Sequence, residues 1–221
     1  AEYLMRRSIA LATEARDAAA PSAWVAASVG PYGAMLAHGE EYIGRYGLSV
    51  AELIAWHRPR WEILLAGNPD VLAVETIPDS DEARAVVELV REYRIPAWLS
   101  YTIDGDVTRA GQPLDEAFAV AADVPEIVAV GVNCCAPGDV LGAVTTAHRV
   151  TGKPVIVYPN SGEVWTARTG CGSAAPAWTP DRRRPGSTPE PASSADAAGC
   201  GRTTSRRWPR RSATFPQPDP D

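Results

Sequence analysis

The chain contains 221 residues, of which 45% are hydrophobic and 22% are charged, and its formal net charge is -6. This composition excludes a collagen and a wholly disordered chain. No stretch approaches the roughly 18 consecutive apolar residues of a membrane-spanning helix, and the N-terminal segment mixes acids with arginines. The sequence therefore predicts a cytoplasmic protein with no membrane partner. Its acidic balance gives no reason to expect a nucleic-acid partner.

The composition changes sharply near residue 165. Residues 166–221 contain no Leu, Ile, Val or Met, but they hold nine of the 20 prolines. Their nine arginines and five acids give them a net charge of +4, which leaves -10 for residues 1–165. Because a segment without aliphatic residues cannot build a core, the sequence predicts a folded domain over 1–165 and a disordered, Pro/Arg-rich tail over 166–221.

Hydrophobic periodicity predicts helices that alternate with short apolar strands through the first region. Helices are expected over 2–19, 49–65, 80–93, 114–122 and 138–150, and strands over 24–29, 71–75, 97–101, 127–132 and 154–158. The first strand has an unbroken apolar run, which is typical of a strand buried on both faces. Ser49 and Glu52 have the spacing of a capping box at a helix start. This alternation implies right-handed crossovers and a parallel sheet.

Polar residues gather where these strands end. They are Ser28, Glu75, Ser100, Thr102, Asn133, Cys134 and Asn160. The carboxyl ends of the strands are where (β/α) barrels keep their sites, whereas a doubly wound sheet usually shows a glycine-rich phosphate loop that is absent here. The predicted fold class is therefore α/β, a (β/α)8 TIM-barrel type. It is expected to be incomplete, because about five of the eight strands are present and the chain begins on a helix.

Four motifs in order give a more specific indication. They are Ser28-Val29-Gly30-Pro31-Tyr32-Gly33, Glu75-Thr76-Ile77-Pro78, Gly131-Val132-Asn133-Cys134 and Tyr158-Pro159-Asn160-Ser161-Gly162-Glu163. Together they resemble the homocysteine S-methyltransferase family over roughly residues 1–165. The resemblance implies transfer of a methyl group from S-methylmethionine or S-adenosylmethionine to homocysteine, giving methionine. It does not indicate which donor is used.

The resemblance also implies a zinc site. A thiol with a pKa of about 8.5 is a poor nucleophile at neutral pH, and Zn²⁺ bound by thiolates would deprotonate the homocysteine thiol. Cys134 occupies the position of one family metal ligand. Cys135 is expected to be a packing residue, because successive side chains leaving a strand point in opposite directions. By resemblance, Glu75 would accept a hydrogen bond from the homocysteine ammonium group, and Asn133 would present an amide near the metal or the substrate.

The sequence lacks the family's Gly-Gly-Cys-Cys motif, which would supply the other metal ligands. We interpret residues after Val164 as an out-of-frame translation and the chain as a fragment, so this chain is expected to be inactive. Two alternatives remain open at this stage. One is a non-catalytic degenerate or binding fragment, and the other is an unrelated barrel lyase or hydrolase that uses Glu75 as a base. Lys153 invites a Schiff-base interpretation, but it precedes its strand and should lie at the opposite end from the site.

Overall fold

The structure is a computed structural model that describes residues 1–162, 164–166 and 171–173. The chain divides into two units, Ala1–Pro180 and Asp181–Asp221, and every described residue belongs to the first. The predicted tail and its proposed change of frame lie almost entirely outside the described residues, so the boundary at residue 165 stays a prediction. None of the helices in the described part of the chain is long and apolar enough to cross a membrane.

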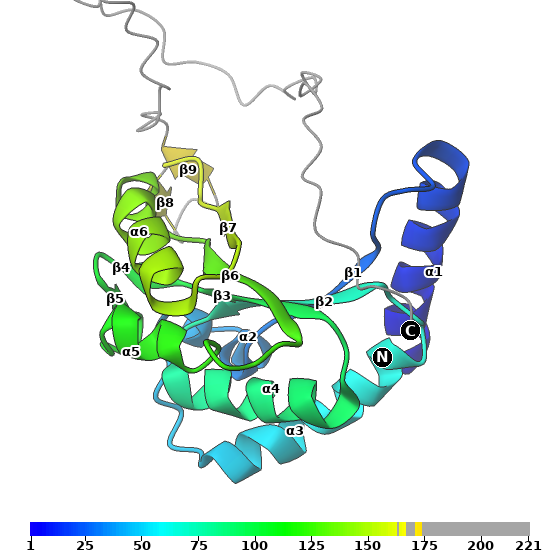
Figure 1. Cartoon of the computed structure of the whole chain (residues 1–221), viewed down its shortest axis with the longest axis horizontal. Coiled ribbons are helices and arrows are strands. Elements are labelled where there is room, and N and C mark those ends of the chain that lie inside the picture. Colours follow the sequence, from blue (N-terminus) through cyan, green and yellow to red (C-terminus); the bar gives the residue numbers. More distant parts are fainter. Residues whose placement is uncertain (163, 167–170, 174–221) are drawn as a thin grey trace, which may run out of the picture. The chain divides into compact units, whose positions relative to one another are not determined.

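Helices and strands alternate along the first unit (Figure 1). The helices are α1 (Glu2–Ala19), α2 (Tyr32–Leu36), α3 (Val50–Leu65), α4 (Ser80–Tyr93), α5 (Leu114–Ala119) and α6 (Val140–Thr151), with the 3-10 turns η1 (Glu40–Tyr42) and η2 (Pro137–Asp139). The strands are β1 (Ala26–Val29), β2 (Val71–Ile77), β3 (Ala97–Tyr101), β4 (Ile103–Asp104), β5 (Val107–Thr108), β6 (Ile127–Asn133), β7 (Val155–Tyr158), β8 (Val164–Thr166) and β9 (Cys171–Ser173).

Five strands form one parallel sheet in the order β1-β2-β3-β6-β7. These are the five strands that the sequence predicts, and their order along the chain equals their order in the sheet, as in a barrel. Two antiparallel pairs, β4-β5 and β8-β9, stand outside this sheet. The β4-β5 hairpin was not predicted, because each of its strands is only two residues long.

Helices cover one face of the sheet. α4 and α6 pack on the strands, α3 packs against α4, and α5 packs against α6, so α3 and α4 lie side by side in Figure 1. The core between them is aliphatic, with Leu72, Val86, Leu99 and Val130 fully buried. The capping box at the start of α3 is confirmed, since the Ser49 side chain and Glu52 each accept a hydrogen bond from the other's backbone N–H.

The expectation that the first strand is buried on both faces is wrong. In β1, Ala27 and Val29 are buried in the core, while Ala26 and Ser28 are exposed on the other face. The physical reason is position, because β1 is an edge strand of the described sheet and only its helix-facing side is covered. α5 also ends at Ala119, three residues before the predicted end.

Candidate active site

The carboxyl ends of the parallel strands carry a connected set of polar side chains. Ser28 comes from β1, Glu75 from β2, Ser100 from β3, Asn133 from the end of β6 and Tyr158 from the end of β7. Polar contacts of 2.5 to 2.9 Å between side-chain atoms link all five across the sheet. The structure therefore brings together four of the polar residues that the sequence places at strand ends, and it adds Tyr158 to them.

Two hydroxyl groups fix the Glu75 carboxylate. The Ser28 hydroxyl donates to Oε1 at 2.5 Å, and the Tyr158 hydroxyl donates to Oε2 at 2.9 Å. Burial raises the pKa of Tyr158 above its ordinary value, so the phenol stays protonated and remains a donor. The indole Nε1 of Trp98 donates to the same phenol oxygen at 3.1 Å. A half-buried carboxylate held from both sides in this way suits the recognition of a cation such as an ammonium group.

Asn133 connects this carboxylate region to Cys134. Its Oδ1 accepts hydrogen bonds from the Thr76 backbone N–H at 2.8 Å and from the Ser100 hydroxyl at 2.6 Å. Its Nδ2 donates to Thr76 Oγ1 at 2.7 Å and to Cys134 Sγ at 3.3 Å. The amide is 1% exposed and its four hydrogen-bonding positions are occupied. Asn133 therefore orients Thr76 and Cys134.

The residues that follow Glu75 and Asn133 have strained backbones. Thr76 has φ of 62° and Cys134 has φ of 49°, both in the left-handed region. For the β-branched Thr76 this conformation is a genuine outlier, and each such residue costs about 1–3 kcal/mol. The hydrogen bonds from Asn133 hold both turns, and as a result Thr76 Oγ1 and Asn133 Nδ2 both donate to the Cys134 sulfur, at 3.8 and 3.3 Å.

The two adjacent cysteines have opposite surroundings. Cys134 is partly exposed at the site, whereas Cys135 is fully buried and belongs to the core. Burial, with a smaller contribution from Asp139, raises the pKa of the Cys135 thiol to about 11. The prediction that Cys135 is a packing residue is confirmed.

The described residues do not form a zinc site by themselves. They contain no cluster of three or more His, Cys, Asp or Glu side chains that could hold a metal ion. Cys134 is partly exposed and supplies one sulfur with two donors directed at it. A structural or catalytic zinc needs three or four protein ligands, so this donor set is insufficient.

A buried network holds the loop that follows β1. The Arg60 guanidinium donates to the Gly30 carbonyl at 2.5 Å and to His57 Nδ1 at 3.0 Å. His57 Nε2 and the Tyr32 backbone N–H both lie against Glu82 Oε1, at 2.8 and 2.6 Å. This loop begins two residues after Ser28, so the network fixes the chain next to the hydroxyl that binds Glu75.

Sequence reasoning missed several parts of this site. Thr76 and Tyr158 fall within the quoted motifs, but no role follows from their positions there. The left-handed φ of Thr76 and the hydrogen bond from Tyr158 to Glu75 depend on contacts between different strands. The pattern of polar residues at strand ends was the one available signal, and it includes Ser28 and Ser100.

The fold and this site define a barrel-type α/β protein with its polar groups at the carboxyl end of a parallel sheet. Comparison with known proteins is more specific, and the chain belongs to the homocysteine S-methyltransferase family, whose model matches residues 1–206. That match continues past residue 165, where the sequence places the end of the barrel domain.

Its relatives carry the same name. The chain is 46% identical over 184 residues to homocysteine S-methyltransferase 4 of Zea mays, covering 76% of this chain and 54% of that protein. It is 44% identical over 172 residues to homocysteine S-methyltransferase of Escherichia coli strain K12, covering 74% of this chain and 56% of that protein. The chain thus spans a little over half the length of these curated relatives.

A solved structure supports the fold. The Escherichia coli homocysteine methyltransferase MmuM in its metallated form is 43% identical, with a TM-score of 0.68 over 73% of this chain and 59% of that chain. The α/β fold of this chain is therefore an incomplete TIM-type barrel, as the sequence predicts.

Proposed function

We propose that this chain is part of an enzyme that transfers a methyl group from a sulfonium donor, S-methylmethionine or S-adenosylmethionine, to homocysteine. The observation that carries the proposal is the set of polar contacts that runs from the Glu75 carboxylate through Tyr158, Ser100 and Asn133 to Cys134. It brings a carboxylate and a cysteine sulfur to one end of the sheet in a member of this family, which supports a substrate role for the first and a metal role for the second. A cytoplasmic location remains a prediction.

Homocysteine presents an ammonium group and a thiol to this end of the sheet. Glu75, fixed by Ser28 and Tyr158, would accept the ammonium group. In the reaction, the homocysteine sulfur forms a bond to the methyl carbon, and the bond from that carbon to the sulfonium sulfur breaks. Its electron pair returns to the donor sulfur, which becomes a neutral thioether, and the thiol proton of homocysteine is released.

Cys134 would be one ligand of the zinc ion that the family resemblance implies. Asn133 would act on the reaction indirectly, by holding the Cys134 sulfur and the strained Thr76 turn. Because Cys134 is the one thiol that the described residues present at the site, we expect this chain to show no turnover by itself.

The test compares two proteins. One is this chain, and the other is a chimera in which the unmatched segments of the Escherichia coli relative complete it. Both are assayed for bound zinc and for methionine formation that depends on homocysteine and on each methyl donor. We expect the chimera to bind about one zinc per chain and to make methionine, and this chain to do neither.

Variants of the chimera then test each residue. Glu75→Gln should raise the KM for homocysteine about tenfold or more, because the ammonium group loses its anionic partner. Cys134→Ser should lower the bound zinc. Glu88→Gln, at an exposed position on α4, is the matched control. It should change neither the KM for homocysteine nor the amount of bound zinc. Turnover by the unmodified chain would show that our account of its ligands is wrong, and a chimera without methionine formation would refute the proposed function.

A further inference from the structure

Arg109 carries an incompletely paired charge near the site. It follows β5, and within the described residues its one carboxylate neighbour is Asp104, with 3.9 Å between nitrogen and oxygen. The Asp104 side chain is 79% exposed, and an exposed contact of that length contributes little. The Arg109 Nε atom is buried without a hydrogen-bond partner in the described part of the chain. Its guanidinium group lies 5.7 Å from the centre of the Tyr42 ring.

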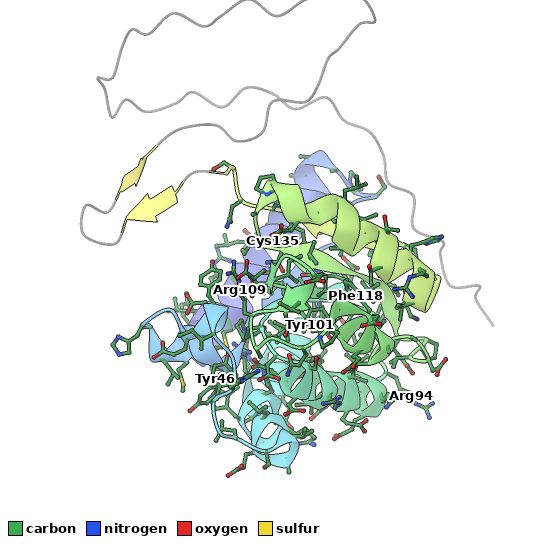
Figure 2. The ribbon with its side chains drawn as sticks, turned by 90° about the vertical axis from the view of Figure 1, so that its left-hand side faces the viewer. Tyr46, Arg94, Tyr101, Arg109, Phe118 and Cys135 are labelled. Carbon is green, nitrogen blue, oxygen red and sulfur yellow. The ribbon has the colours of Figure 1, made fainter. Side chains whose placement is uncertain are left out.

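Arg109 and Tyr42 border Cys134. The Arg109 backbone N–H donates to the Thr102 carbonyl at 3.4 Å, and the Thr102 hydroxyl donates to the Cys134 carbonyl at 3.1 Å. Burial and the neighbouring Cys134 side chain raise the pKa of the Tyr42 hydroxyl. The positive charge of Arg109 also interacts with the Cys135 thiol, where it opposes the effect of burial on the pKa. Cys135 lies close to Arg109 in the view of Figure 2. The guanidinium group therefore lies beside the cysteine end of the site.

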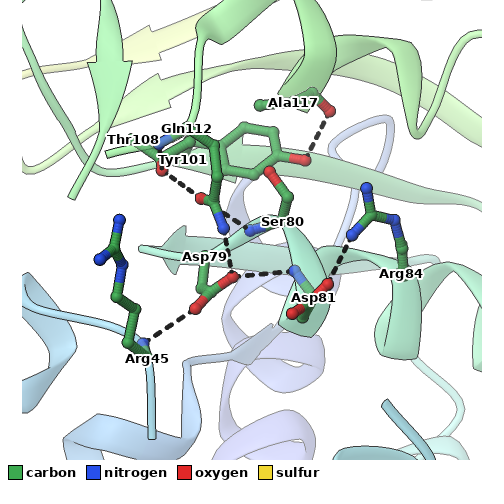
Figure 3. A network of polar contacts seen from close by, with 9 residues as sticks. All are labelled: Arg45, Asp79, Ser80, Asp81, Arg84, Tyr101, Thr108, Gln112 and Ala117. Atoms are coloured by element: carbon green, nitrogen blue, oxygen red, sulfur yellow. Dashed lines mark hydrogen bonds and ion pairs between the residues drawn. The ribbon is translucent and has the colours of Figure 1, made fainter. Parts of the chain in front are cut away.

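A polar network centred on Asp79 holds the segments that carry these two side chains (Figure 3). Asp79 Oδ2 accepts from the Arg45 backbone N–H at 2.8 Å, and Oδ1 accepts from Gln112 Nε2 at 2.7 Å. Arg45 Nε donates to the Ala110 carbonyl at 2.6 Å. Arg45 lies three residues after Tyr42, and Ala110 and Gln112 follow Arg109, so one buried carboxylate fixes both loops to the start of α4.

We propose that Arg109, resting on the Tyr42 ring, binds the α-carboxylate of an amino-acid substrate at Cys134. The inference rests on the proposed function, because homocysteine and S-methylmethionine are both α-amino acids. Arginine presents five donors in a planar fork that matches a carboxylate, and in the described part of the chain the Arg109 guanidinium group donates no hydrogen bond. Glu75 supplies the opposite charge for an ammonium group. The site thus holds one group for each end of an α-amino acid zwitterion.

The first experiment measures the dissociation constants of homocysteine and S-methylmethionine for the full chain by calorimetry. Arg109→Gln should weaken binding of one of the two ligands about tenfold or more, and the affected ligand identifies whose carboxylate Arg109 binds. Arg94→Gln is the matched control, because Arg94 follows α4 and precedes β3 at the opposite end of the sheet, away from Arg109 in Figure 2. It should bind both ligands as the unmodified chain does.

The second experiment repeats the measurement with the decarboxylated analogue of the affected ligand. The unmodified chain should bind the analogue about tenfold more weakly than the parent amino acid, whereas Arg109→Gln should bind the two equally. An equal loss for parent and analogue in Arg109→Gln would mean a structural role and would overturn the inference.

The remaining outcomes separate the inference from the proposed function. If the unmodified chain binds either amino acid and Arg109→Gln binds it equally well, the inference is wrong while the proposed function stands. If the unmodified chain binds neither amino acid, both the inference and the proposed substrate recognition by this chain are contradicted.

Discussion

Arg60 donates a hydrogen bond to Nδ1 of the buried His57 at 3.0 Å, and this contact fixes the protonation state of the imidazole. Arginine has no acceptor, so Nδ1 must accept and the proton lies on Nε2. Nε2 then donates to Glu82 Oε1 at 2.8 Å. His57 is therefore neutral. It links the Arg60 guanidinium group to the Glu82 carboxylate, which in turn accepts a hydrogen bond from the Tyr32 backbone N–H.

The neutral His57 predicts a loss of stability in mild acid. Burial is the largest cause that lowers the pKa of His57 below its ordinary value of 6.5, and the Arg60 charge adds to it, against the opposing effect of Glu82. The unfolded chain therefore takes up the proton first as the pH falls. The stabilisation from His57 is complete above about pH 6.5 and is lost as the pH falls through the lowered pKa. The free energy of unfolding, measured in urea between pH 8 and pH 5, reports this loss of stability.

The variant His57→Gln isolates this contribution. A glutamine amide can donate to Glu82 and accept from Arg60 as the neutral imidazole does, but it does not titrate. Its free energy of unfolding should fall less steeply below pH 6.5 than that of the unmodified chain. Equal slopes for His57→Gln and the unmodified chain would contradict the assignment.

Removal of the Glu82 carboxylate should be strongly destabilising. Glu82 is fully buried, and Glu82→Ala leaves both the Tyr32 N–H and the His57 Nε2–H without an acceptor. We expect a loss of about 3 kcal/mol in the free energy of unfolding, measured in urea at pH 7.5. Glu88→Ala, on the exposed side of the same helix, should change it by less than about 0.5 kcal/mol. If the two variants change the free energy of unfolding by similar amounts, the buried network does not contribute to stability as we expect.

The sequence predicts the sheet well because its strands are short, mainly apolar runs between helices with clear ends. The capping box of Ser49 and Glu52 is a local signal, and it is present in the structure. The neutral state of His57 is different, because it depends on Arg60, one helical turn away, and on Glu82 from the next helix. No local pattern predicts such a contact.

The same contrast between local and long-range signals applies to the residues of the candidate site. Glu75, Asn133 and Cys134 are recognisable because they end strands within motifs. Arg109 has no such signal, because it directly follows a short hairpin and becomes notable only when Tyr42 and Cys134 are placed beside it.

The two adjacent cysteines should differ in reactivity. Cys134 is partly exposed, whereas burial raises the pKa of Cys135 to about 11, so little of its thiolate exists at pH 8. Iodoacetamide at pH 8 should alkylate Cys134 at least about tenfold faster than Cys135. Mass spectrometry of the peptide that contains both residues, with Cys134→Ser and Cys135→Ser to assign each site, provides the rates. Faster alkylation of Cys135 would contradict its burial in the core.

Gly131 should tolerate no side chain. A Cβ atom at this position in β6 would lie 1.7 Å from the Ile156 carbonyl oxygen in β7, and a backbone atom cannot move aside as a flexible side chain can. Gly131→Ala should therefore separate the two strands and lower the free energy of unfolding by about 3 kcal/mol or more. Gly142 on α6 is the matched control, because nothing lies within 4 Å of its Cβ position. Gly142→Ala should raise the free energy of unfolding by about 0.5–1 kcal/mol, since alanine favours a helix interior. If Gly131→Ala unfolds at the same urea concentration as the unmodified chain, β6 and β7 cannot approach as closely as the structure places them.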